Sequence, residues 1–131
     1  MYRKMIAGLF LFTLIALPAM AGDDEEKPQI TYFALKPSIV SNLTGGPKYI
    51  RCDIQLMTEQ PEEVYQLETH APALRHTILM LIAGQDGRAL TSRDGKEKLR
   101  TDALESVQTT LKEMTGKEIV NDLYFTAYYV K

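Results

Sequence analysis

The chain has 131 residues, of which 45% are hydrophobic, and a formal net charge of −2 at neutral pH. This size suits one domain with its own core. The slight acidity, and the lack of a basic patch interleaved with aromatic residues, argue against nucleic-acid binding. Cys52 is the only cysteine, which excludes a domain held together by internal disulfides. Its place in an alternating apolar pattern predicts a buried, unreactive thiol.

Residues 1–21 have the three parts of an export signal. Arg3 and Lys4 form a basic start, residues 5–17 are apolar, and small residues lead to a cleavage site between Ala21 and Gly22. The apolar run is short for a membrane span, which needs about 20 residues, so we expect cleavage. The alternative is a retained single anchor in the inner membrane. The basic residues before the run orient the following domain outward in both cases.

The next segment, residues 22–29, is acidic and has no apolar periodicity. This composition predicts a solvated linker. The acidic run is not followed by the liganding spacing of an EF-hand loop, so calcium binding is not favoured. The folded domain is therefore expected to span residues 30–131.

Two strands are predicted at the start of the domain. Residues 30–43 are rich in aromatic and β-branched side chains, and Pro37 among them indicates an edge strand or a bend. Residues 49–57 alternate between apolar and polar positions, which is typical of a half-buried strand. The turn at Gly45-Gly46 joins the two segments, so we expect an antiparallel hairpin. The apolar positions of the second strand are Ile50, Cys52, Ile54 and Leu56.

A long amphipathic helix is predicted to follow. Pro61 marks its start, because proline is favoured in a first helical turn, and apolar residues then recur at three- and four-residue steps up to Gly84. Pro72 lies inside this pattern and predicts a kink or a short break near His70 and Ala71.

A second helix is predicted after a cap at Thr91 or Ser92, and Gly116 ends it. Its apolar stripe consists of Leu99, Ala103, Val107, Leu111 and Met114. A final strand then covers residues 119–130.

In this final strand, alternation places Leu123, Phe125, Ala127 and Tyr129 on one face, and Tyr124, Thr126, Tyr128 and Val130 on the other. Because both faces carry apolar side chains, we expect a central strand, or one with helices on one side and a partner on the other. Leu99, Leu111 and Phe125 are predicted core positions. The order of the elements predicts an α+β fold with a small antiparallel or mixed sheet and two main helices on one face.

No group of residues has catalytic or metal-binding spacing. His70 and His76 are six residues apart on the first helix, about 240° around its axis, so they cannot share one metal ion. The serines lack a nucleophile elbow, and the glycines lack a phosphate-binding loop. We therefore expect no enzymatic activity, no cofactor and no metal.

Two groups of residues are candidates for an interface. The first is the charged start of the second helix, with Arg93 and Lys96; its simplest interpretation is a solvated face on which Arg100 reaches Glu97. The second is the tyrosines of the last strand, because tyrosine offers a large amphipathic contact area. There we expect Tyr124 and Tyr128 at an interface and Tyr129 in the core. The two groups would be two separate contact surfaces of the domain.

Two short stretches carry a family resemblance: Gly95-Lys96-Glu97-Lys98-Leu99-Arg100 and Tyr124-Phe125-Thr126. With weaker matches at residues 38–43, 71–75 and 78–81, the chain resembles the flagellar basal-body-associated FliL family over about residues 32–130. The resemblance implies a stomatin-like periplasmic domain held at the inner membrane by one anchor. It also implies homo-oligomeric rings that contact flagellar stator and basal-body proteins, and support of rotation, motility and chemotaxis without catalysis.

The chain departs from the family pattern in two places. Lys131 stands where the family usually ends in glutamine, and the cleavage site before Gly22 stands where the family retains a transmembrane helix. A cleaved chain would be a soluble periplasmic paralogue. The alternative function is therefore a soluble periplasmic adaptor or binding module unrelated to motility.

Overall fold

The sheet has three antiparallel strands, in the order β1-β2-β3. In the computed structural model, which describes residues 27–131, these strands are β1 (Thr31–Asn42), β2 (Tyr49–Thr58) and β3 (Asp122–Val130). The hairpin of β1 and β2 is confirmed. β1 is an edge strand, and its pairing with β2 is irregular between Leu35 and Ile39, around Pro37. The predicted export signal, its predicted cleavage site and residues 22–26 of the predicted linker lie outside the described residues.

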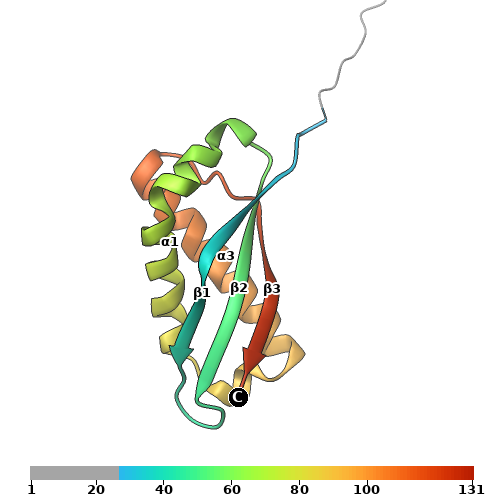
Figure 1. Cartoon of the computed structure of the whole chain (residues 1–131), viewed down its shortest axis with the longest axis vertical. Coiled ribbons are helices and arrows are strands. Elements are labelled where there is room, and N and C mark those ends of the chain that lie inside the picture. Colours follow the sequence, from blue (N-terminus) through green and yellow to red (C-terminus); the bar gives the residue numbers. More distant parts are fainter. Residues whose placement is uncertain (1–26) are drawn as a thin grey trace, which may run out of the picture.

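The helices lie on one face of this sheet (Figure 1). A 3-10 turn, η1 (Pro61–Glu63), leads into α1 (Val64–Ala83), and α3 (Arg93–Thr115) is the second long helix. The predicted α+β fold with two main helices is confirmed. A short helix that the sequence did not predict, α2 (Gly87–Leu90), connects α1 to α3.

The core lies between the sheet and the two long helices. All four apolar positions of β2 are at most 2% exposed, as predicted. The core positions of α1 are Leu67, Leu74, Ile78 and Ile82, and those of α3 are Leu99, Ala103, Val107 and Leu111. The prediction for Met114 is wrong: its side chain is 49% exposed, because it lies in the last turn of α3, beyond Leu111, the last buried position of the helix.

Of the kink or short break predicted near Pro72, the break does not occur. α1 continues without interruption from Val64 to Ala83, and Figure 1 shows it as one ribbon. Pro72 is exposed, with Leu67 and Leu74 buried on either side of it in the sequence. The helix keeps its packed face and leaves the proline on its open side.

β3 differs most from the prediction. It is an edge strand, and β2 is the central one. Its register against β2 shifts between Phe125 and Ala127. Leu123 is buried and Phe125 packs against the core, but after the shift Tyr128 and Val130 are the residues that pack inward. Tyr129 is 52% exposed, so its predicted place in the core is wrong, and Phe125 is a partly buried core residue.

Candidate protein-interaction site

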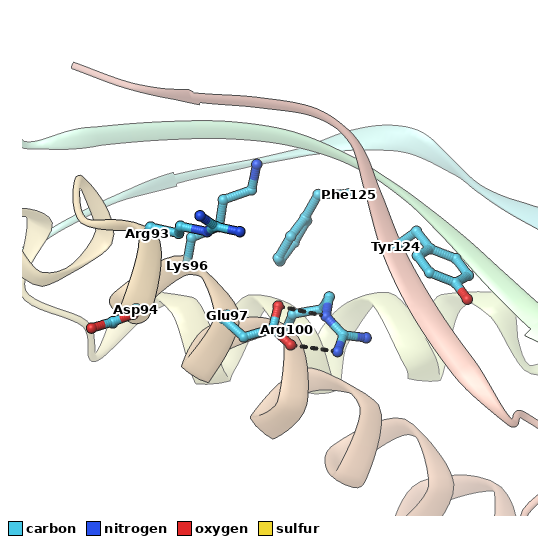
Figure 2. A pocket seen from close by; sticks show the side chains of 7 residues that line it. All are labelled: Arg93, Asp94, Lys96, Glu97, Arg100, Tyr124 and Phe125. Carbon is cyan, nitrogen blue, oxygen red and sulfur yellow. Dashed lines mark hydrogen bonds and ion pairs between the residues drawn. The ribbon is translucent and has the colours of Figure 1, made fainter.

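A groove lies between the first turns of α3 and the edge strand β3. It has a volume of about 420 Å³, and Figure 2 shows the side chains around it. It is lined by Arg93, Asp94, Lys96, Glu97, Arg100, Tyr124 and Phe125. A neighbouring hollow of about 460 Å³ shares Arg93 and Lys96 and is also lined by Tyr128. The four predicted interface residues therefore lie around two adjoining hollows, and their use as interfaces stays a prediction.

The start of α3 is held in place by its cap and by a glycine. The Ser92 hydroxyl accepts a hydrogen bond from the Gly95 N–H at 2.9 Å, which confirms the predicted cap. A Cβ atom on Gly95 would lie 1.7 Å from the Ala89 carbonyl oxygen. Only a residue without a side chain allows α3 to start this close to α2. This close approach sets where Arg93 and Lys96 leave the helix.

Arg100 connects α3 to β3. Its guanidinium makes two hydrogen bonds to the Glu97 carboxylate, at 2.9 and 2.6 Å, as the three-residue spacing predicts. It also donates to Asp122 at 2.6 Å and to the Leu123 carbonyl at 3.1 Å. The hydrogen bond from Arg100 lowers the pKa of Glu97, and the pKa of Arg100 is raised in return. Arg100 is therefore a paired structural cation at one end of the groove.

Tyr128 connects β3 to the start of the helices. Its hydroxyl donates to the Leu90 carbonyl at 2.7 Å, and its ring lies 5.2 Å from that of Phe125. The Lys96 ammonium lies over the ring, 4.8 Å from its centre, which is a cation–π contact. Burial, followed by the nearby Cys52, raises the pKa of Tyr128 to about 12. The hydroxyl has a structural role, so Tyr128 can offer a partner only the open part of its ring.

Two residues of this region, Phe125 and Arg100, were not recognised as site residues from the sequence. Phe125 was assigned to the core, yet its partly buried ring lines the groove. Arg100 was expected to pair with Glu97 alone. Its pairing with Asp122 joins residues 22 positions apart, and no local spacing signals such a contact.

The described part of the chain has few features that would bind a metal ion. Within residues 27–131, no group of three or more His, Cys, Asp or Glu residues is placed to hold a metal ion. Cys52 is fully buried, and burial together with the charge of Asp53 raises its pKa to about 12. None of the helices in this range is long and apolar enough to cross a membrane.

The fold and the groove define a small α+β domain with a charged, aromatic surface at a sheet edge. The family model described as "Flagellar basal body-associated protein FliL" matches residues 32–130. The chain therefore belongs to the FliL family.

Named relatives agree with this assignment. The Flagellar protein FliL of Escherichia coli (strain K12) is 25% identical over 116 residues, which cover 86% of this chain and 75% of the relative. The same values hold for the Flagellar protein FliL of Shigella flexneri. The Flagellar protein FliL of Aquifex aeolicus (strain VF5) is 23% identical over 101 residues, which cover 76% of this chain and 60% of the relative.

Proposed function

We propose that this chain supports the flagellar stator through protein contacts, and thereby flagellar rotation, motility and chemotaxis. Membership of a basal-body-associated family supports this proposal. The single observation that supports this contact surface is the groove with its neighbouring hollow, around which Arg93, Lys96, Tyr124 and Tyr128 lie.

The mechanism is differential binding and requires no catalysis. A scaffold that binds the torque-generating conformation of a stator subunit more tightly than the resting one shifts the population toward the active state. A homo-oligomeric ring of such scaffolds also needs head-to-tail contacts between two different surfaces of each subunit. In this proposal the groove and its neighbouring hollow serve the stator contact, and the ring contacts lie elsewhere on the domain.

The domain acts in the periplasm, at the inner membrane. The basic start, the apolar run and the small residues before Gly22 support export. N-terminal sequencing of the protein from fractionated cells should begin at Gly22. An intact Met1 in the membrane fraction would establish the anchored form instead.

A deletion strain tests the motility function directly. We expect reduced swimming and swarming, restored by the wild-type chain and not by the double charge reversal Arg93→Glu and Lys96→Glu. Lys112→Glu, an exposed position in the last turn of α3, is the matched control and should restore motility. Crosslinking to stator components should fail only in the double variant. Normal motility of the deletion strain, with no crosslink to the stator, would contradict the proposal and support the periplasmic adaptor.

A further inference from the structure

One edge of β3 is free. β3 pairs with β2 along its other edge, and no further strand of residues 27–131 adds to the sheet on this side. A free edge presents backbone N–H and C=O groups with which another chain can pair.

The groove reaches this free edge. Tyr124 and Phe125 are consecutive strand residues, so their side chains point to opposite faces of the sheet. Burial agrees, since Phe125 packs against the core and Tyr124 is 38% exposed. Figure 2 shows the two rings on opposite sides of the strand. Because both residues line the same groove, the groove must extend around the outer edge of β3.

The free edge of β3 is closed where side chains of the domain already hydrogen-bond to its backbone, and open where none within residues 27–131 does. At Leu123 the backbone N–H donates to the Asp122 carboxylate at 2.8 Å, and the carbonyl accepts from Arg100 at 3.1 Å. From Phe125 to Val130, no side chain in the described part of the chain hydrogen-bonds to the backbone. The groove and its neighbouring hollow follow β3 along this open part. A strand rises about 3.3 Å per residue, so there is room for about six extended residues.

The helix side of the groove presents cations to this open edge. Arg93 and Lys96 point from α3 toward Phe125, and Asp94 points away (Figure 2). Neither cation belongs to an ion pair within residues 27–131. The third cation, Arg100, is held by carboxylates. A ligand along the edge would therefore meet two uncompensated positive charges.

We infer that the open edge of β3 binds an extended, acidic segment of a partner protein, which adds to the sheet as a fourth strand. Backbone hydrogen bonds to β3 hold the segment, as in other cases of strand addition. Its carboxylates face Arg93 and Lys96, which select acidic over basic segments. The inference rests on the proposed function only in taking the ligand to be a protein.

A peptide titration tests the charge selection. The probe is a labelled synthetic peptide of about eight residues in which glutamate and valine alternate, long enough to cover the open edge. It is titrated against the full chain as isolated from cells. We expect saturable binding that weakens about tenfold or more with Lys96→Glu and is unchanged with Lys112→Glu. A glutamine–valine peptide removes the charge from the ligand alone and should bind as weakly, whatever the variant does to folding. Equal binding of a lysine–valine peptide would overturn the inference.

Amide hydrogen exchange tests the strand addition. At saturating peptide, we expect slower exchange of β3 amides between Phe125 and Val130, and no change at the β1 edge. Binding without protection of β3, or protection confined to α3, would overturn the inference. Normal motility of the deletion strain refutes the stator function and leaves this result unaffected. A peptide that fails to bind refutes strand addition and leaves the motility result unaffected.

Discussion

Arg100 is the residue on which the contact between α3 and β3 depends most. Its side chain is 26% exposed and shares its hydrogen bonds among Glu97, Asp122 and the Leu123 carbonyl. Burial works against the ionised form of Asp122. Hydrogen bonds, first from the Leu123 N–H and also from Arg100, outweigh burial and lower the pKa of that carboxyl. This partly buried carboxylate loses part of its stabilisation once Arg100 is removed.

Replacing Arg100 with Met should lower the free energy of unfolding by about 2 kcal/mol, because charged hydrogen-bond partners of a partly buried site are left unpaired. Lys98→Met is the matched control on the same helix. Lys98 also forms an ion pair, with Asp102 at 2.5 Å, but its side chain is 76% exposed, so its loss should cost under about 0.5 kcal/mol. Urea unfolding of both variants measures the difference, and equal losses would contradict the assigned role.

The same variant should change the response to acid. The pKa values of Glu97 and Asp122 are lowered in the folded state, so their contribution to stability is present above their unfolded pKa values, near 4, and is lost as the pH falls. Without Arg100 the two carboxylates contribute less to stability, so less stability is lost as the pH falls. The difference in stability between wild type and Arg100→Met should therefore shrink between about pH 5 and pH 3.

Among the elements, the start of α3 depends on a glycine that helix propensity alone would disfavour. Replacing Gly95 with Ala should gain about 1 kcal/mol of propensity. The added Cβ would lie 1.7 Å from the Ala89 carbonyl oxygen, however, and such overpacking typically costs about 1–3 kcal/mol or more. We expect net destabilisation in urea melts.

Gly84→Ala is the control for this prediction. A Cβ on Gly84, which ends α1, would meet no atom within 4 Å, so the change should alter stability by less than about 0.5 kcal/mol. Stabilisation by Gly95→Ala would show that α2 and α3 do not approach closely. Gly95→Ala should also weaken peptide binding at the β3 edge, since it displaces Arg93 and Lys96.

Elements with regular periodicity could be predicted from the sequence. The alternation around Cys52 identified the buried face of β2, and the steps from Leu99 to Leu111 identified that of α3. β3 could not be predicted as well, because one register shift opposite β2 reverses the facing of every later side chain. That shift exchanged the roles of Tyr128 and Tyr129. It depends on pairing between strands far apart in the sequence, so no local pattern reveals it.

Part of the residue set around the candidate site could be predicted from the sequence, but its geometry could not. Arg93, Lys96, Tyr124 and Tyr128 were recognised from charge and side-chain type, whereas their convergence depends on α2, a four-residue helix without an apolar period. Such a short helix is set by tertiary contacts. One of these is the Gly87 N–H, which donates to the Thr44 carbonyl at 2.9 Å.

At the scale of the whole molecule, α1 packs mainly against β1 and α3 mainly against β3. The buried side chains of the central strand β2 belong to the same core, so the described domain has one continuous core. Cys52 lies on β2 and is 0% exposed. A domain of this size with a single core is expected to unfold cooperatively. The single thiol of the chain therefore reports on the unfolding of the entire domain, and its labelling position is unambiguous.

A thiol reagent should label Cys52 only after global unfolding. Burial and the charge of Asp53 raise the pKa of Cys52 to about 12 in the folded state, so the native thiol is both inaccessible and protonated. Labelling in increasing urea should follow the loss of helical circular dichroism. Labelling well before that transition would show that β2 opens locally and would contradict a single cooperative core.

The same thiol should make the free energy of unfolding depend on pH in the alkaline range. The unfolded thiol ionises near pH 9 while the folded one retains its proton, so the unfolded state binds fewer protons and stability falls as the pH rises toward 12. The slope from this residue is at most about 1.4 kcal/mol per pH unit. Cys52→Val, which keeps an apolar side chain of similar size, should flatten the decline between about pH 9 and pH 10.5. Tyr128, whose pKa is also raised to about 12, would add to the decline only above about pH 10, where the unfolded phenol ionises. An unchanged slope in Cys52→Val at pH 9 to 10 would mean that the native thiol ionises as readily as the unfolded one, and that water reaches the centre of the sheet.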